Sequence, residues 1–229
     1  MTTVSRLSAA FHEVGAEHFQ AMLPAEAVRE LLTIAERMPA NRAGVRLFGD
    51  PSLQELLGPQ GSVGRLPTTV LGAAARPVRA VVFDKTQKTN WLVPWHQDRT
   101  IAVRDRGEVD GFGPWSIKAG VHHVEPPFEL LVDMVTLRVH LDDCDEANAP
   151  LLIAPGSHLL GRVRATDAQA EAERIGGVAC LAQAGDVWLY ATPILHASDR
   201  AKRPRRRRVL QVDYAICDLP DGLDWIGIA

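Results

Sequence analysis

The sequence has few cysteines and no long apolar run, and both shortages narrow the class of protein. Its three cysteines, Cys144, Cys180 and Cys217, form no C-x-x-C pair and are odd in number. A reduced intracellular compartment is the simplest explanation of that pattern. The start of the chain has no basic segment followed by an apolar one, and no run approaches the ~20 apolar residues of a membrane span. We therefore expect a soluble cytoplasmic protein with no membrane partner.

The chain also lacks a strong charge of either sign. Its formal net charge of −3 argues against bulk electrostatic binding to nucleic acid. The one basic cluster, Arg203 and Arg205 to Arg208, lacks the interleaved aromatic residues that stack on bases, so we expect no nucleic-acid partner. With 229 residues, 46% of them hydrophobic and 23% charged, the chain can bury one substantial core. We expect a single domain over residues 1–229.

The first sixty residues have the patterns of helices. Between Pro24 and Pro39, the apolar residues Val28, Leu31 and Leu32 recur at helical spacing. A second short helix is predicted over residues 52–57. Residues 1–60 are therefore predicted to form a helical N-terminal elaboration that packs on a sheet.

Strands dominate the rest of the chain, where about residues 78–215 are predicted to form the core. Alternating or short apolar runs predict strands at residues 78–84, 133–142, 151–154, 178–181, 186–190 and 206–214, and a helix is expected over 165–174. The Gly- and Pro-containing segment 99–127 is predicted to be a long active-site loop. Many short strands after a helical start indicate a mainly β protein with flanking helices, a double-stranded β-helix or cupin-like jelly roll.

A candidate metal site lies in Trp95-His96-Gln97-Asp98. In an extended segment, residues i and i+2 project from the same face about 6.5 Å apart, so His96 and Asp98 can hold one ion between them. A third ligand is available in His196, which follows a strand-like run. Two histidines and one carboxylate form the facial triad of non-haem Fe(II) oxygenases, which leaves coordination sites open for a chelating co-substrate and dioxygen. The alternative for an H-x-D tripeptide alone is a surface pair with no metal.

Several motifs together resemble the phytanoyl-CoA dioxygenase family. They are WHQD at residues 95–98, LDDCDEANAPLLIAPGSH at 141–158, and AGDVWLYATPILHAS followed by PRRRRVLQVDYA. The resemblance spans roughly residues 78–215. It implies Fe(II), 2-oxoglutarate and O₂ as requirements, with His96, Asp98 and His196 as the iron ligands. One departure is Ala149, where the family commonly has Gly in an Asn-Gly turn.

The same resemblance implies a site for the co-substrate. By similarity, Arg207, eleven residues after the distal histidine, anchors the distal carboxylate of 2-oxoglutarate, and Ser198 helps to hold it. The strand pattern agrees, because Arg207 falls on the face opposite to the apolar residues Leu210, Val212 and Tyr214. A guanidinium matches a carboxylate bidentately and stays charged. The other arginines of the basic cluster are expected to form a solvated surface.

The strand at 133–142 has one apolar and one mostly polar face. If the polar face lines a barrel mouth, Thr136 can hydrogen-bond the bound carboxylate, and Arg138 would favour an anionic substrate. The alternative places that face in water. In the segment 99–127, Trp115 and Lys118 are further candidates to line a substrate pocket, unless the aromatic residue only anchors a loop.

The remaining histidines are weaker candidates for ligands. His122 and His123 are expected at the surface or facing substrate, His140 as a hydrogen-bonded core residue, and His158 in a structural turn. The sequence therefore predicts a 2-oxoglutarate-dependent Fe(II) dioxygenase that hydroxylates a C–H bond of a small molecule and releases succinate and CO₂. The alternative is a cupin-like metal-dependent non-oxygenase or a small-molecule binding protein on the same barrel.

Overall fold

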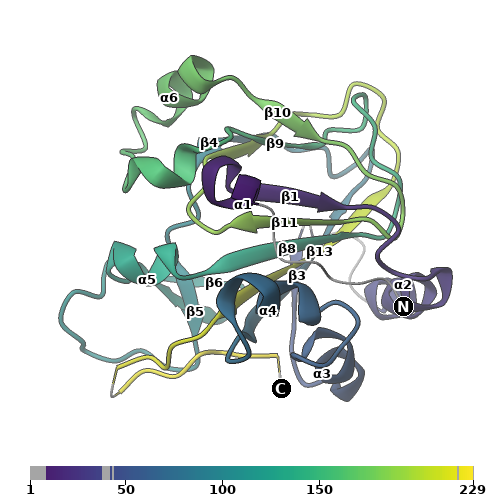
Figure 1. Ribbon diagram of the computed structural model, residues 1–229. Helices are drawn as coiled ribbons and strands as arrows, with labels where there is room; N and C mark the ends of the chain where they lie inside the picture. The colour runs from purple at the N-terminus through teal and green to yellow at the C-terminus, as the bar shows by residue number, and fades with distance from the viewer. Residues whose placement is uncertain (1–8, 38–41, 43, 221, 229) are drawn as a thin grey trace.

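The computed structural model describes residues 9–37, 42, 44–220 and 222–228. Within them, antiparallel strands form two larger sheets and one small sheet (Figure 1). The largest sheet has the order β1-β11-β8-β13-β3-β2. Its strands are β1 (Ala16–Phe19), β11 (Val187–Ala191), β8 (Val135–His140), β13 (Arg207–Ala215), β3 (Arg76–Lys85) and β2 (Gly44–Leu47).

The second sheet faces the largest one and has the order β10-β9-β12-β4. Its short strands are β10 (Val178–Cys180), β9 (Leu151–Ile153), β12 (His196–Ser198) and β4 (Val93–His96). Residues from both sheets line one cavity between them. This is the double-stranded β-helix that the strand pattern predicts.

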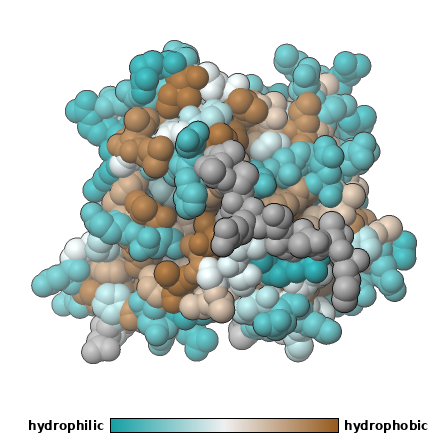
Figure 2. Space-filling model, in the orientation of Figure 1, coloured by the Kyte–Doolittle hydropathy of each residue, from teal (hydrophilic) through white to brown (hydrophobic). Residues whose placement is uncertain are grey.

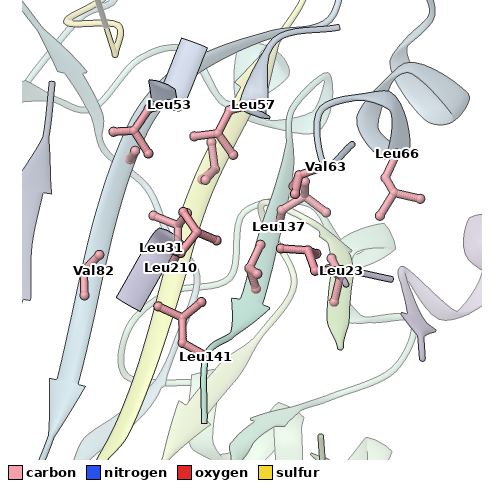
Figure 3. Packing of buried hydrophobic residues seen from close by; sticks show 14 of the residues in the cluster. Leu23, Leu31, Leu53, Leu57, Val63, Leu66, Val82, Leu137, Leu141 and Leu210 are labelled. Carbon is pink, nitrogen blue, oxygen red and sulfur yellow. The ribbon is translucent and has the colours of Figure 1, made fainter. Parts of the chain in front are cut away.

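Helices cover the outer face of the largest sheet, where the main apolar core lies (Figure 3). They are α2 (Ala25–Glu36), α3 (Pro51–Leu57) and α4 (Arg65–Leu71). Leu31, Leu53 and Leu57 from the helices pack in one cluster with Leu137 and Leu210 from the sheet. Each such leucine contributes about 1.5–3 kcal/mol on burial. The apolar face of the sheet therefore packs against the helices, and its polar face lines the cavity.

The burial of β8 shows whether its polar face lines the barrel or lies in water. All six residues of the strand are buried. Leu137 belongs to the core under the helices, while Arg138 lines the cavity on the opposite face. On β13, Leu210 and Arg207 divide between the two faces in the same way. The polar faces of the central strands therefore point into the barrel and not into water.

The prediction of a helical N-terminal elaboration over residues 1–60 is only partly right, because the region contains strands as well as helices. Besides α1 (Ala9–Val14) and the helices above, it contributes the strands β1 and β2. These are four-residue edge strands that pair with β11 and β3. Their extended conformation depends on partners distant in sequence, which a local pattern does not contain.

The prediction of one long loop over 99–127 is wrong. The segment forms the small sheet β5-β7-β6, made of β5 (Ile101–Val103), β7 (Val121–Val124) and β6 (Trp115–Lys118). Ala119 and Gly120, both with positive φ, make the tight turn between β6 and β7. Strands of three or four residues between glycines are too short to show alternation. A helix, α5 (Phe128–Val132), then leads into β8.

The other predicted helices are present. The segment predicted at 165–174 forms α6 (Ala168–Ile175), which lies beside β4 in Figure 1, and a 3-10 turn, η1 (Ser157–Leu160), follows the P-G motif. None of the helices in the described residues is both long and apolar enough to cross a lipid bilayer. Figure 2 shows hydrophobic residues interspersed with hydrophilic ones on the face toward the viewer.

Candidate metal centre and cavity

The structure brings the three predicted metal ligands together. His96 ends β4 and His196 begins β12, and the two residues are directly paired across the strands. Asp98 follows β4 by two residues. One ligand atom from each of the three side chains lies within 4.8 Å of the others, and His96 Nε2 is 3.9 Å from Asp98 Oδ1. The i, i+2 spacing and the strand pairing thus place two imidazoles and one carboxylate around one point.

Both imidazoles are held in the tautomer that a metal ion needs. His96 Nδ1 lies 2.8 Å from the carbonyl oxygen of Pro94, and His196 Nδ1 lies 3.0 Å from that of Ile194. A carbonyl only accepts, so each Nδ1 carries the proton and each Nε2 keeps a free lone pair. The donor set therefore fits a divalent metal ion bound through two Nε2 atoms and a carboxylate.

Gln97, between the ligands, points the other way and fixes the segment. Its Nε2 donates to the carbonyl oxygens of Gly161, at 2.9 Å, and Pro193, at 2.8 Å, while its Oε1 accepts from the Val163 backbone N–H. Pro193 lies three residues before His196. The side chain therefore ties the segment of the first two ligands to the segment that delivers the third.

The local electrostatics favour an ionised Asp98 and a neutral His196. Burial alone would raise the pKa of Asp98, but His196, Arg79 and His96 outweigh it and lower that pKa to about 2. Burial lowers the pKa of His196 to about 4, against the opposing charge of Asp98. At neutral pH, Asp98 is thus ionised and His196 neutral, as metal ligands must be.

The triad opens into a cavity of about 240 Å³ between the two sheets. The lining is rich in cations, and Asp98 is the one carboxylate in it among the described residues. The charged lining residues are Arg46, Arg79, Lys85, Asp98, Arg138 and Arg207. The cavity lining is therefore electropositive.

At the end of the cavity opposite Asp98, Arg207 lies as its strand pattern predicts. It is 2% exposed, its Nη1 donates to the Ala149 carbonyl oxygen at 2.5 Å, and its Nε has no hydrogen-bond partner. Ser198 Oγ donates to the same carbonyl oxygen at 3.2 Å. Lys85, also buried, donates from Nζ to Ser198 Oγ at 2.9 Å. Three donors therefore converge on one end of the cavity.

Lys85 is a residue that the sequence analysis missed. Burial, with the nearby charges of Arg207 and Arg138, lowers the pKa of its ammonium to about 7. Its ammonium lies 4.9 Å from the centre of the Trp91 ring. The lysine ends β3 directly opposite Arg207 of β13. Only the pairing of strands far apart in sequence reveals this proximity.

Arg138 lines the middle of the cavity, as predicted for an inward-facing residue. Its Nη1 donates to Gln211 Oε1 at 2.8 Å, and Gln211 Nε2 lies 3.5 Å from Asp98 Oδ2. Arg79 completes the surroundings of the carboxylate, with Nη2 at 3.8 Å from Asp98 and Nε at 2.5 Å from Asp213. The candidate ligand Asp98 is thus held by a chain of charged and amide groups on the large sheet.

Three predicted site residues do not line the cavity. Thr136 is fully buried, and its hydroxyl lies 3.1 Å from Thr192 Oγ1 and 3.2 Å from Asp213 Oδ1. The side chain is used by the polar network beneath the site. Trp115 packs in the apolar cluster of the small sheet, and Lys118 donates to Thr100 Oγ1 at 3.2 Å.

The other histidines differ partly from expectation. His123 is fully buried and not at the surface, and its Nε2 lies 3.2 Å from Arg46 Nη2. His140 is buried as predicted, but neither of its ring nitrogens has a hydrogen-bond partner among the described residues. His158 Nε2 lies 3.2 Å from the His12 carbonyl oxygen, in a structural role.

The basic cluster is less solvated than predicted. Arg206 forms an exposed pair with Asp84 at 2.9 Å, and Arg205 pairs with Asp145. Arg208, however, is 9% exposed and donates to Asp142. Acidic side chains on neighbouring segments therefore neutralise the arginines that flank Arg207.

A model of the family described as phytanoyl-CoA dioxygenase (PhyH) matches residues 11–209. The chain belongs to this family. The PhyH match includes every residue of the triad and Arg207. No curated protein shows a significant sequence match to the chain.

Several solved structures have the same fold as this chain at low sequence identity. The non-heme alpha ketoglutarate dependent epimerase SnoN from nogalamycin biosynthesis is 20% identical with a TM-score of 0.66, over 93% of this chain and 86% of SnoN. EctD from S. alaskensis, with 2-oxoglutarate and 5-hydroxyectoine, is 18% identical with a TM-score of 0.68, over 94% and 78%. The carbocyclase SnoK is 17% identical with a TM-score of 0.63, over 93% and 86%. These likenesses support the double-stranded β-helix.

Proposed function

We propose that the protein is a 2-oxoglutarate-dependent Fe(II) dioxygenase that hydroxylates a C–H bond of a small molecule, with the whole chain as one oxygenase domain. One observation carries the proposal. The triad of His96, Asp98 and His196 faces a cavity whose far end holds the buried, partly unpaired guanidinium of Arg207. A candidate metal site and a candidate carboxylate site thus share one cavity.

The triad would hold Fe(II) through the two free Nε2 lone pairs and one oxygen of Asp98. Because these three side chains come from β4, the segment after it and β12, they would hold the ion from the protein side and leave it accessible from the cavity. Bound iron, with 2-oxoglutarate and O₂, supplies the oxidising chemistry that inserts one oxygen atom into a C–H bond while 2-oxoglutarate becomes succinate and CO₂.

The far end of the cavity would hold the distal carboxylate of 2-oxoglutarate. Arg207 presents its unpartnered Nε there, and Ser198 and Lys85 add a hydroxyl and an ammonium. A buried charge without a partner is costly, so a bound carboxylate is the natural partner of Arg207. Under the cupin-like alternative, in which the protein does not use 2-oxoglutarate, the buried Arg207 would have no co-substrate carboxylate as its partner.

The presence of Asp98 argues against chlorination and for hydroxylation or desaturation, of which we propose hydroxylation. Related enzymes that chlorinate have Gly or Ala in place of this carboxylate, which opens a site for halide. Similar folds named as epimerase and carbocyclase show that one fold hosts several reactions. The product must therefore be identified directly.

The test is turnover of 2-oxoglutarate by the Fe(II)-loaded protein with a library of small metabolites. We expect succinate in proportion to O₂ consumed, and a product that contains one additional oxygen atom. His196→Ala should lose metal binding and succinate formation together, whereas the surface variant Arg206→Ala should keep both. Failure of the metal-loaded wild type to bind 2-oxoglutarate would sink the proposal, and a product without added oxygen would reject hydroxylation alone.

A further inference from the structure

The strand register separates two cationic ends of the cavity. The inward-facing residues of β3 run from Arg79, beside Asp98, to Lys85, beside Arg207. Six residues of strand span roughly 20 Å. Arg46 of the edge strand β2 is paired with Val81 and therefore lies near the metal end.

Arg46 is a cation at this end that has no carboxylate partner among the described residues. Arg79 is paired with Asp213 and Asp98, but no carboxylate of the described residues lies within ion-pair distance of Arg46. Its Nη2 lies 3.2 Å from His123 Nε2, and its buried Nε has no hydrogen-bond partner. Burial, and next the charge of Arg79, lowers the pKa of Arg46. The guanidinium thus lines the cavity with its charge and one donor unused.

His123 fixes the guanidinium without neutralising it. Its Nδ1 lies 3.0 Å from the Val121 carbonyl oxygen, so Nδ1 carries the proton and Nε2 accepts from Arg46. Burial, together with the charge of Arg46 and against the Val121 hydrogen bond, lowers the pKa of His123 to about 4. The imidazole is therefore neutral at pH 7. It positions Arg46 and leaves its positive charge for a ligand.

A second cation lies on the same side of the metal centre. Lys118 of β6 is bound to the hydroxyl of Thr100, and no carboxylate of the described part of the chain lies within ion-pair distance of it. It is close enough to Asp98, Arg79 and Arg46 for their charges to act on its ammonium. The small sheet thus places His123 in contact with Arg46, and places Lys118 where the charge of Arg46 acts on its ammonium.

We propose that Arg46, held in place by His123, binds a carboxylate of the substrate at the metal end of the cavity, with Lys118 adding positive charge from outside the cavity lining. The inference rests on the proposed function, in which the co-substrate's own distal carboxylate occupies the opposite end at Arg207. The Arg46 guanidinium, whose Nη2 contacts His123 and whose Nε is unpartnered, can bind a monocarboxylate bidentately through Nε and a neighbouring Nη. The substrate class is therefore a small carboxylic acid.

The test uses protein loaded with Mn(II) in place of Fe(II) and with saturating 2-oxoglutarate. The co-substrate then binds but is not turned over. Linear, cyclic and aromatic monocarboxylates, each with its primary amide and the corresponding alkyl or aryl phosphate, are titrated by calorimetry. We expect one or more carboxylates to bind and the matching amides to bind at least tenfold more weakly. Arg46→Met should weaken carboxylate binding by about ten- to a hundredfold, as expected for a lost charge-assisted hydrogen bond. Arg46→Lys should retain part of the affinity, and the exposed control Arg29→Met all of it.

Several outcomes overturn the inference. They are binding of no carboxylate in the panel, equal binding of amides, preference for phosphates, or carboxylate binding unchanged in Arg46→Met. A loss of 2-oxoglutarate affinity in Arg46→Met, measured before any probe is added, would assign Arg46 to the co-substrate instead. If wild-type protein fails to bind 2-oxoglutarate, the proposed function fails, and the carboxylate titration is then read on protein with Mn(II) alone. Thermal melting of each variant confirms that it is folded.

Discussion

At the scale of single residues, Arg207 shows how burial leaves an arginine with an unpaired hydrogen-bond donor. Its Nη1 contacts only the Ala149 carbonyl oxygen and, at 4.0 Å, Cys144 Sγ, and its Nε is unpartnered. Its neighbour Arg206 is in an exposed ion pair with Asp84. Exposed pairs contribute little to stability or binding. Arg206 directly precedes β13 and Arg207 begins it, and the two adjacent side chains point in opposite directions, one to an exposed ion pair and one into the cavity.

We predict that Arg207→Ala weakens binding of 2-oxoglutarate to the Mn(II)-loaded protein by about 2–5 kcal/mol, the usual cost of breaking a buried charge pair. Arg206→Ala is the matched control and should bind 2-oxoglutarate like the wild type. Titration calorimetry measures both. A large loss in the Arg206 variant with normal binding in the Arg207 variant would show that the anchor lies on the other face of β13.

At the scale of elements, the turn before β9 supports this end of the cavity with an unusual residue. Ala149 has a φ of 54°, in the left-handed region that favours glycine. Its carbonyl oxygen accepts from Arg207 and Ser198. The alanine thus keeps the conformation expected of an Asn-Gly turn and fixes two residues of the proposed co-substrate site.

We predict that Ala149→Gly stabilises the protein by up to about 1 kcal/mol. Relief of left-handed strain, about 1–2 kcal/mol, is partly offset by the greater entropy of glycine in the unfolded chain. Ala147→Gly in the same turn, where φ is not positive, should destabilise the protein by about 0.4–1 kcal/mol. Urea unfolding compares the two. Equal destabilisation by both substitutions would mean that Ala149 is not strained.

The length of a strand decided whether the sequence pattern could predict it. The long strands β3, β8 and β13 were predictable because alternation extends over six or more residues, and this also placed Arg207 and Arg138 inside. The triad was predictable from the H-x-D spacing and the order of motifs. The strands β5 to β7 were missed, and with them the contact of His123 with Arg46. That contact requires two short strands from different sheets to meet, which no local window records.

At the scale of the whole molecule, charge is distributed unevenly between interior and surface. The chain has a formal net charge of −3, yet the cavity is lined by five cations and one carboxylate. Lys85, Arg138 and Arg207 are each less than 10% exposed. The net charge of the chain argues against bulk attraction of polyanions, although the cavity lining itself is positively charged. Bound anions should therefore stabilise the folded protein.

The buried histidines predict how the stability of the whole molecule depends on pH. Burial lowers the pKa of His123 and of His196 to about 4, and that of His140 well below its ordinary value of 6.5. Between about pH 6.5 and pH 4 the unfolded chain therefore binds more protons than the folded one. The stabilisation from the neutral histidines is fully present above pH 6.5 and is lost as the pH falls toward 4.

We predict that the free energy of unfolding of the metal-free protein falls by up to about 1.4 kcal/mol per pH unit for each of these histidines as the pH is lowered below 6.5. Urea unfolding in the presence of a chelator, from pH 8 to pH 4.5, measures this slope. His140→Gln removes one buried titrating group that lies outside the metal ligands, so its slope should be shallower than that of the wild type. Added Mn(II) should steepen the loss, because protonation of His196 then also releases the metal ion. A free energy that stays constant between pH 6.5 and pH 4.5 would contradict the burial of neutral imidazoles on which the prediction rests.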